Sequence, residues 1–182
     1  MPQKLRLTLL GNVSIQKGKK PVSGLPSRAA EALFIYLACN QRPVMREKLA
    51  ELLWAERTSA QALTNLRTIL TSLRRELGDF LIVTRDTLAF DDESEYWLDT
   101  VEFEHQLKDL GLPDRGNIPG DADTAAKLQA TLDLYQGDFL EGFHLRDGIG
   151  FEEWVILQRE HLRQSAREGF RLLTHYYREK GF

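Results

Sequence analysis

The sequence predicts an α+β N-terminal domain, made of a β meander, three helices and a C-terminal β-hairpin, followed by an all-α helical domain. Three observations support this prediction: short alternating apolar runs open the chain, leucines at helical spacing follow, and helical spacing returns in the second half. The 182 residues are 42% hydrophobic and 28% charged, which is typical of a globular chain of one or two domains. We therefore expect one domain at residues 1–92 and another at residues 96–182.

Three short strands are predicted before the first helix. Residues 4–10 alternate apolar and polar side chains, as half-buried strands do. Turn signals at residues 11–12 and 18–19 bracket a second alternating run around residues 13–15, and a third run ends at Val22. This order is typical of a small antiparallel meander.

Two helices are expected after the meander. Pro26 opens the first, because proline is favoured at the start of a helix, and the helical spacing ends near Asn40. Residues 42–43 then break the chain, and leucines at helical spacing predict a second helix over residues 45–55.

The third predicted helix covers residues 58–77. Thr58 and Gln61 form a capping-box pattern at its start, and Gly78 is the expected stop at its end. Its apolar side chains fall within about 120° of arc, the width of one core-facing stripe. The stripe consists of Leu63, Leu66, Ile69, Leu70, Leu73 and Leu77.

The opposite face of this helix carries short hydrogen-bonding side chains with arginines beside them, and Glu76 is its only acidic residue. Short side chains allow close approach to a major groove, and a Thr methyl can contact a thymine methyl. Gln and Asn can pair with adenine, while Arg can bind guanine or phosphate. We therefore predict that the helix reads double-stranded DNA through Gln61, Thr64, Asn65, Arg67, Thr68, Thr71, Ser72, Arg74 and Arg75.

The neighbouring segments complete a winged helix-turn-helix. The helix that precedes residue 55 supplies the first half of the helix-turn-helix. Short apolar runs at residues 80–83 and 87–90 flank Arg85 and Asp86 and predict a hairpin. We expect this hairpin to act as a wing, with Arg85 entering the adjacent minor groove.

The second half is predicted to be helical throughout. Residues 91–95 have no apolar pattern and are the best linker candidate, and the segments 111–123 and 142–150 are expected to be loops. The aromatic residues of this half are more simply the core of stacked helix pairs than the lining of a ligand pocket. The predicted helices cover residues 99–110, 122–140 and 150–179.

The net charge of −3 conceals an asymmetry between the two halves. Residues 1–90 contain 14 basic and 7 acidic residues, a net charge of +7, whereas residues 91–182 contain 10 basic and 20 acidic residues, a net charge of −10. The basic half is suited to a polyanion and the acidic half to a protein partner.

Six short segments, taken in order, resemble the SARP family of antibiotic regulatory proteins. In that family a winged helix of the response-regulator type, the output domain used in phosphorelay systems, precedes an all-α bacterial transcriptional activator domain with tetratricopeptide-like helix pairs. The matching segments are residues 49–54 (LAELLW), 62–67 (ALTNLR), 73–78 (LRRELG), 99–103 (DTVEF), 135–140 (YQGDFL) and 151–154 (FEEW).

The resemblance implies transcriptional regulation, usually activation, through binding to direct repeats upstream of promoters. The positions that would read DNA carry over by motif to six residues of the third helix. Family members often have more arginine on this face, where this chain has Thr71 and Ser72. The six positions are Thr64, Arg67, Thr68, Thr71, Ser72 and Arg75.

The resemblance also implies protein partners for the acidic helical domain, either RNA polymerase or a partner subunit. In the family the helical array continues, so we expect this chain to be an N-terminal fragment that stops within the array at Phe182. An array cut there leaves apolar surface uncovered, which would favour a homodimer.

No catalytic pattern is found. The four histidines lack the spacing of a zinc site, no glycine-rich phosphate loop is present, and no serine lies in a nucleophile elbow. We therefore expect neither an enzyme nor a bound cofactor or metal. The single Cys39, the absence of a signal peptide and the absence of an apolar run of about 18 residues predict a cytoplasmic protein without a membrane partner.

Two alternatives stay open at this stage. The helical array could be a protein-interaction scaffold in which the winged domain does not bind DNA, because a fold does not fix a function. An acidic outer face on the third helix would have favoured this alternative, and that face is not acidic. A hydrolase or metalloenzyme is a distant third.

Overall fold

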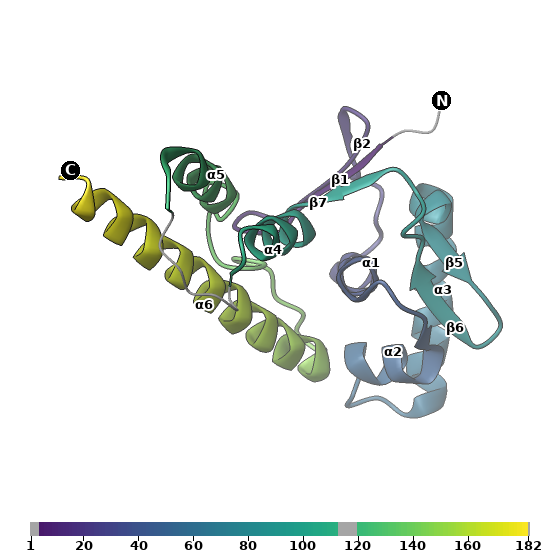
Figure 1. Cartoon of the computed structure of the whole chain (residues 1–182). Coiled ribbons are helices and arrows are strands. Elements are labelled where there is room, and N and C mark those ends of the chain that lie inside the picture. Colours follow the sequence, from purple (N-terminus) through teal and green to yellow (C-terminus); the bar gives the residue numbers. More distant parts are fainter. Residues whose placement is uncertain (1–3, 113–119, 182) are drawn as a thin grey trace. The chain divides into compact units, whose positions relative to one another are not determined.

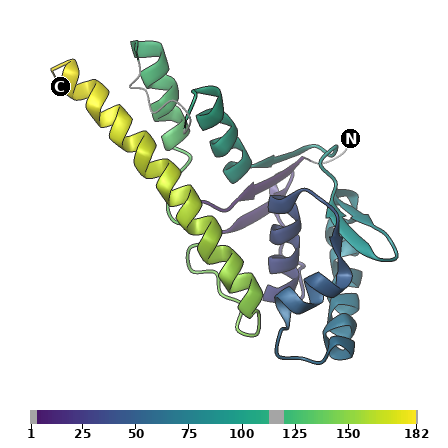
Figure 2. The ribbon, with the colours of Figure 1, turned by 60° about the horizontal axis from the view of Figure 1, so that its bottom comes forward.

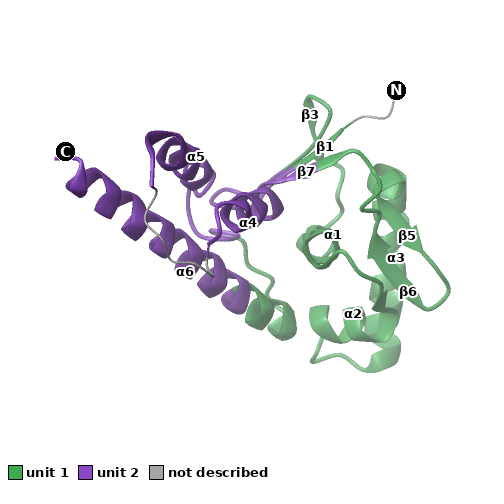
Figure 3. Cartoon of the chain, in the orientation of Figure 1, with its two compact units in different colours: residues 1–6, 15–96, 143–155 green, residues 7–14, 97–142, 156–182 purple. Residues whose placement is uncertain are grey.

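The computed structural model describes residues 4–112 and 120–181, which form two compact units (Figures 1 and 3). Unit 1 comprises residues 1–6, 15–96 and 143–155, and unit 2 comprises residues 7–14, 97–142 and 156–182. Both units are therefore discontinuous in sequence, whereas the prediction divides the chain once, between residues 92 and 96. Part of the predicted loop 111–123 lies outside the described residues.

The predicted meander is present, with a strand order of β3-β2-β1-β7. Leu5 and Leu7 are fully buried whereas Arg6 is exposed, as the alternating pattern of the first strand requires. The fourth strand, β7, was not predicted. The residue that precedes it is hydrogen-bonded to the first residue of β1, because the Leu5 amide donates to the Glu95 carbonyl (3.0 Å). The strands are β1 (Leu5–Thr8), β2 (Ser14–Lys17), β3 (Lys20–Pro21) and β7 (Tyr96–Leu98).

Three helices of unit 1 follow the prediction closely: α1 (Arg28–Asn40), α2 (Arg46–Leu53) and α3 (Ser59–Leu77). Ser27 caps α1 by accepting from the Ala30 amide (3.3 Å), and Gln41 ends it with a φ of 50°. The helices α2 and α3 pack against each other, and α1 packs against both (Figure 1). The helix-turn-helix pair is thus held on a common core that includes Leu33, Phe34 and Leu49, each fully buried.

The predicted hairpin is confirmed as β5 (Leu81–Val83) and β6 (Thr87–Phe90), which pair antiparallel. A short strand, β4 (Val44–Met45), was not predicted and pairs antiparallel with β6 on its other side, in the order β4-β6-β5. Gly78 does follow the last residue of α3, but it keeps a right-handed φ of −60° and begins a 3₁₀ turn, Gly78–Phe80. The Phe34 and Phe90 rings meet edge to face (5.9 Å), which fixes β6 on α1.

In unit 2, helices α4 (Asp99–Asp109) and α5 (Ala122–Leu132) pack side by side (Figure 2). The helix α6 (Ile149–Glu179) begins in unit 1 and continues through unit 2. Asp99 is buried at the start of α4, and its carboxylate accepts from the Leu9 and Leu10 amides (2.7 and 2.8 Å). This carboxylate therefore anchors α4 to the segment after β1.

Two predictions for the second half are wrong in detail. The helix predicted over residues 122–140 ends at Leu132, because the following residues pair with the N-terminal segment instead: the Gly11 amide donates to Asp138 O and the Leu140 amide to Leu9 O. The second half is also not wholly helical, since it opens with β7. Within the described ranges, no helix is both long and apolar enough to cross a membrane.

Candidate nucleic-acid interface

The orientation of α3 is set by its two ends and by its buried stripe. The Thr58 Oγ1 accepts from the Gln61 amide (3.4 Å), and the Gln61 Oε1 accepts from the Thr58 amide (3.3 Å), which confirms the capping box. Along the helix, the buried residues are Ala62, Leu66, Ile69, Leu70, Leu73 and Leu77. Leu63 was predicted to belong to this stripe, but it is only half-buried, and the small Ala62 takes its place against the core.

The predicted polar face of α3 points away from the core. None of its members is buried, so no described segment of the chain covers this face. Asn65 and Ser72 are half-buried and lie along its borders. The exposed members are Gln61, Thr64, Arg67, Thr68, Thr71, Arg74 and Arg75.

The three threonines of this face use their hydroxyls within the helix. The Oγ1 atoms of Thr64, Thr68 and Thr71 donate to the carbonyl oxygens four residues earlier (2.8, 3.1 and 3.0 Å). With its hydrogen engaged, each hydroxyl offers only lone pairs to a ligand, and the methyl group becomes the other accessible part of the side chain. Such a surface is suited to thymine methyl groups and to the amino group of adenine or cytosine.

Arg75 differs from the other arginines of α3 because it is already paired. Its Nε donates to the Glu76 Oε1 (2.9 Å), a contact that the sequence analysis missed. Adjacent residues of a helix do not normally face each other, so the spacing alone gave no signal. A ligand that binds Arg75 must therefore compete with this carboxylate.

The wing carries Arg85 at an exposed turn. The Thr84 Oγ1 accepts from the amides of Asp86 (3.3 Å) and Thr87 (2.9 Å), which closes the turn around Arg85. The turn is also held from α2: the Arg46 amide donates to Asp86 O (2.9 Å), and the Arg46 Nη2 donates to Thr84 O (2.6 Å). The hairpin is thus fixed to the first helix of the helix-turn-helix.

A hollow of about 380 Å³, which we call the arginine hollow, lies between α2 and α3 and is lined by Arg46, Arg67, Leu70, Thr71 and Arg74. Three of its five lining residues are cationic and none is acidic. Arg46 was not among the predicted site residues, because it lies on α2 and reaches the hollow only through the packing of α2 against α3. The arginine hollow is therefore the most cationic of the described hollows in unit 1.

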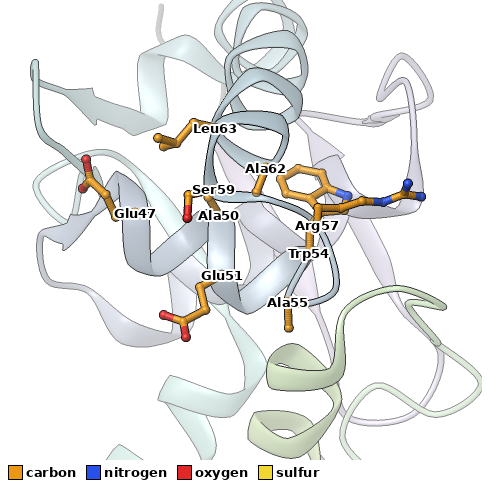
Figure 4. A pocket seen from close by; sticks show the side chains of 9 residues that line it. All are labelled: Glu47, Ala50, Glu51, Trp54, Ala55, Arg57, Ser59, Ala62 and Leu63. Carbon is orange, nitrogen blue, oxygen red and sulfur yellow. The ribbon is translucent and has the colours of Figure 1, made fainter.

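A second hollow of about 300 Å³ lies at the turn between α2 and α3 (Figure 4). Its lining includes Glu47 and Glu51 on α2, with Trp54 and Leu63 as its larger apolar side chains. Two carboxylates disfavour the approach of a phosphate. Arg57 also lines this hollow, so its lining carries a net charge of −1 beside the N-terminal end of α3.

No group of three or more His, Cys, Asp or Glu side chains within residues 4–112 and 120–181 could hold a metal ion. The four histidines each lie beside a carboxylate instead, as in the contact between His161 Nε2 and Glu104 Oε1 (2.8 Å). Cys39 is half-buried in α1.

Comparison with known proteins shows the fold alone. A scan of family models and a search of curated proteins found no match. Among solved structures, the chain is similar to EmbR from Mycobacterium tuberculosis, solved in complex with a low-affinity phosphopeptide, with a TM-score of 0.68 and 20% identity. The match covers 90% of this chain but only 44% of that chain, so this chain spans less than half the length of its structural neighbour. EmbR therefore shares the fold of this chain over nearly its whole length, including the helix-turn-helix, the hairpin and the helical second half.

Proposed function

We propose that this chain is a sequence-specific DNA-binding transcriptional regulator that acts as an activator. In this proposal α3 lies in a major groove, and the β5–β6 hairpin is the wing that carries Arg85 to the adjacent minor groove. The observation that supports it most directly is the polar face of α3, which is exposed along its length while the opposite face is anchored in the core. A structural likeness to a regulator is consistent with the proposal.

Base readout and backbone binding are assigned to different residues of α3. Gln61, Asn65 and the threonines face base edges, where their short side chains allow the helix to approach closely. Arg67 and Arg74 bind phosphates, since cations at the border of a recognition helix position it on the backbone. Arg75 reads a guanine once it has left Glu76.

The helical part supplies the protein contacts in this proposal. It binds RNA polymerase or a partner subunit, and the protein acts in the cytoplasm at direct repeats upstream of promoters. The functional division places the DNA-binding domain at residues 1–92 and the activator domain at residues 96–182. A homodimer would place two α3 helices on two adjacent repeats.

The test is selection of bound sequences from random duplexes, followed by gel-shift titration at several salt concentrations. About 4–6 phosphate contacts give a slope of log K against log salt of about −4 to −5. Arg75→Ala should reduce the preference for the selected sequence, whereas Arg67→Ala should weaken all sequences to a similar degree. A chain that enriches no sequence, and whose duplex binding does not depend on salt, contradicts the proposal.

One observation favours the scaffold alternative. Ile156 and Leu157 on α6 are 61% and 70% exposed, which is unusual for two adjacent large apolar side chains and fits a protein partner. One experiment distinguishes the two functions. A scaffold binds no duplex, whereas a regulator binds duplex DNA even after Ile156→Ser and Leu157→Ser.

A further inference from the structure

We propose that the arginine hollow binds one backbone phosphate of the DNA, and that Arg46 is the residue through which this phosphate also fixes the wing. This inference rests on the proposed function and adds to it a binding residue outside α3.

The charge of the hollow favours an anion. Arg67 and Arg74 lie seven residues apart on α3, with Thr71 between them, so the three side chains share one face of the helix. Within the part of the chain that the structure describes, neither guanidinium has a hydrogen-bond or ion-pair partner. Arg46 adds a third positive charge from α2, and like charges at close range repel unless an anion lies between them.

The hydrogen-bonding groups of the hollow specify an oxygen-rich anion. Leu70 is 5% exposed and contributes no polar side-chain atom, and the Thr71 hydroxyl already donates to Arg67 O. The side-chain donors directed at a ligand are therefore guanidinium N–H groups. Guanidinium groups match the paired oxygens of a phosphate, which accept two parallel hydrogen bonds from one fork.

Arg46 is held in place but retains unused donor capacity. Its Nη2 donates to Thr84 O (2.6 Å), whereas its Nε is buried without a hydrogen-bond partner among residues 4–112 and 120–181. Because the Nε is enclosed by the chain, a phosphate in the arginine hollow would bind this guanidinium through its remaining Nη hydrogens.

The same residue connects the phosphate to the wing. The Arg46 side chain and amide both bind the turn that carries Arg85, through Thr84 O and Asp86 O. A phosphate bound to Arg46 therefore lies at a fixed register from Arg85. One phosphate would in this way position both α3 in the major groove and the wing at the adjacent minor groove.

The experiment replaces single phosphates of a selected duplex with neutral methylphosphonates and measures the affinity of the full chain for each. For the wild type, one position near the α3 contact should lose about tenfold in affinity, as expected for charge-assisted hydrogen bonds. Arg46→Gln, Arg67→Gln and Arg74→Gln should each bind the unmodified duplex more weakly and should lose most of the penalty at that same position.

Arg42→Gln is the matched control, since it removes one exposed charge four residues from Arg46 without lining the hollow. This variant should retain the full tenfold penalty at the same phosphate. Arg46→Lys keeps the charge but not the fork, and should retain only part of the penalty.

The outcomes separate the two proposals. If the wild type binds a selected sequence but the three Gln variants keep the penalty, or lose it at unrelated positions, the inference is wrong and the proposed function stands. If the wild type binds no duplex, both fail. Should Arg46→Gln not fold, as judged by circular dichroism, Arg67→Gln and Arg74→Gln still test the phosphate contact, because both residues are exposed. Arg46→Lys then tests the part of Arg46: a full tenfold penalty in that variant would overturn its role.

Discussion

Glu76 affects the polar face of α3 because it is the only acidic residue of this helix and it pairs with Arg75. Its side chain is 33% exposed and pairs with Arg75, whose side chain is 71% exposed. A Cβ added to Gly24 would come within 2.8 Å of the Glu76 carboxyl carbon, so the carboxylate lies directly against the segment before α1. Glycine at position 24 thus makes room for Glu76 to turn toward Arg75.

Glu76→Gln should strengthen DNA binding about fivefold at low salt. In the proposed complex with DNA, the substitution removes a negative charge near the phosphates and releases Arg75, and the two effects together are on the order of 1 kcal/mol, which corresponds to about fivefold in affinity. Gel-shift titration at two salt concentrations measures the change. Glu76→Asp keeps the charge and is the control; equal strengthening by both variants, or strengthening that persists at high salt, would contradict this account.

At the scale of elements, the N-terminus of α3 depends on its capping box. Thr58→Ala leaves the Gln61 amide without its acceptor, so the free energy of unfolding should fall by about 1 kcal/mol. For a chain of this size that corresponds to a decrease in Tm of about 2–4 °C. Thermal melting followed by circular dichroism measures it.

Ser59→Ala is the control for this prediction. Ser59 is exposed and adjacent to Thr58, but it lies inside the helix and is not its cap. Its substitution should leave the Tm unchanged to within about 1 °C, because surface substitutions away from such features cost little. Equal decreases for the two variants would show that the capping box does not stabilise α3.

The elements that the sequence predicted best are those with local signals. The capping box and the leucine stripe placed α3 to within a residue, and Arg85-Asp86 between two apolar runs placed the hairpin. In contrast, β4 and β7 have two and three residues, too few to show an alternating pattern, and they exist because partner strands lie beside them. The polar face of α3 was predictable for the same local reason, whereas Arg46 joins the arginine hollow only through tertiary packing.

The end of α5 shows the same limit. Residues 133–140 continue a plausible helical pattern, but the chain leaves the helix at Asp133 and forms a bridge between Phe139 and Leu10. A Cβ on Gly137 would lie 3.1 Å from the Gly11 Cα, so the two backbones approach closely through glycine at both positions. Contacts between residues more than 120 positions apart therefore override the local preference.

At the scale of the whole molecule, acid should act first on unit 2. The pKa of the Asp138 carboxyl lies below its ordinary value of 3.8 chiefly because Arg163 donates hydrogen bonds to it, and that of Glu168 is lowered in the same way by Arg171. The pKa of Asp121 is lowered mainly by the Thr124 amide. All three carboxyls belong to unit 2.

A lowered pKa means that the folded state binds protons less readily than the unfolded state. The stabilisation is therefore fully present above the ordinary values of 3.8 to 4.5 and is lost as the pH falls below them. Hydrogen exchange at pH 7, 4 and 3 should show that protection in α5 decreases before protection in α3. Asp138→Asn should lower the free energy of unfolding at pH 7, and so reduce the difference between the free energies of unfolding at pH 7 and pH 3. An unchanged difference would contradict the assignment of acid sensitivity to Asp138.

The charge asymmetry along the sequence is much weaker between the two units. Unit 1 contains 15 basic and 14 acidic residues, a net charge of +1, and unit 2 contains 9 basic and 13 acidic residues, a net charge of −4. The difference arises because the acidic residues of segments 91–95 and 143–155 belong to unit 1. The helix α3 keeps a net charge of +2, from three arginines and Glu76, within a unit that is nearly neutral as a whole.

For the proposed DNA-binding function, this distribution predicts that the association rate with a duplex can be raised without changing the proposed interface. Asp92→Asn, Glu93→Gln and Glu95→Gln together remove three exposed negative charges and change unit 1 from +1 to +4. Since long-range attraction follows net charge and is screened by salt, the association rate with a duplex should rise several-fold at about 0.01 M salt and hardly at all at 1 M. Stopped-flow association measures this rate, and the charge-conserving set Asp92→Glu, Glu93→Asp and Glu95→Asp is the control. An increase in the control set, or one that survives at 1 M salt, would mean that the segment acts through its contacts and not through its charge.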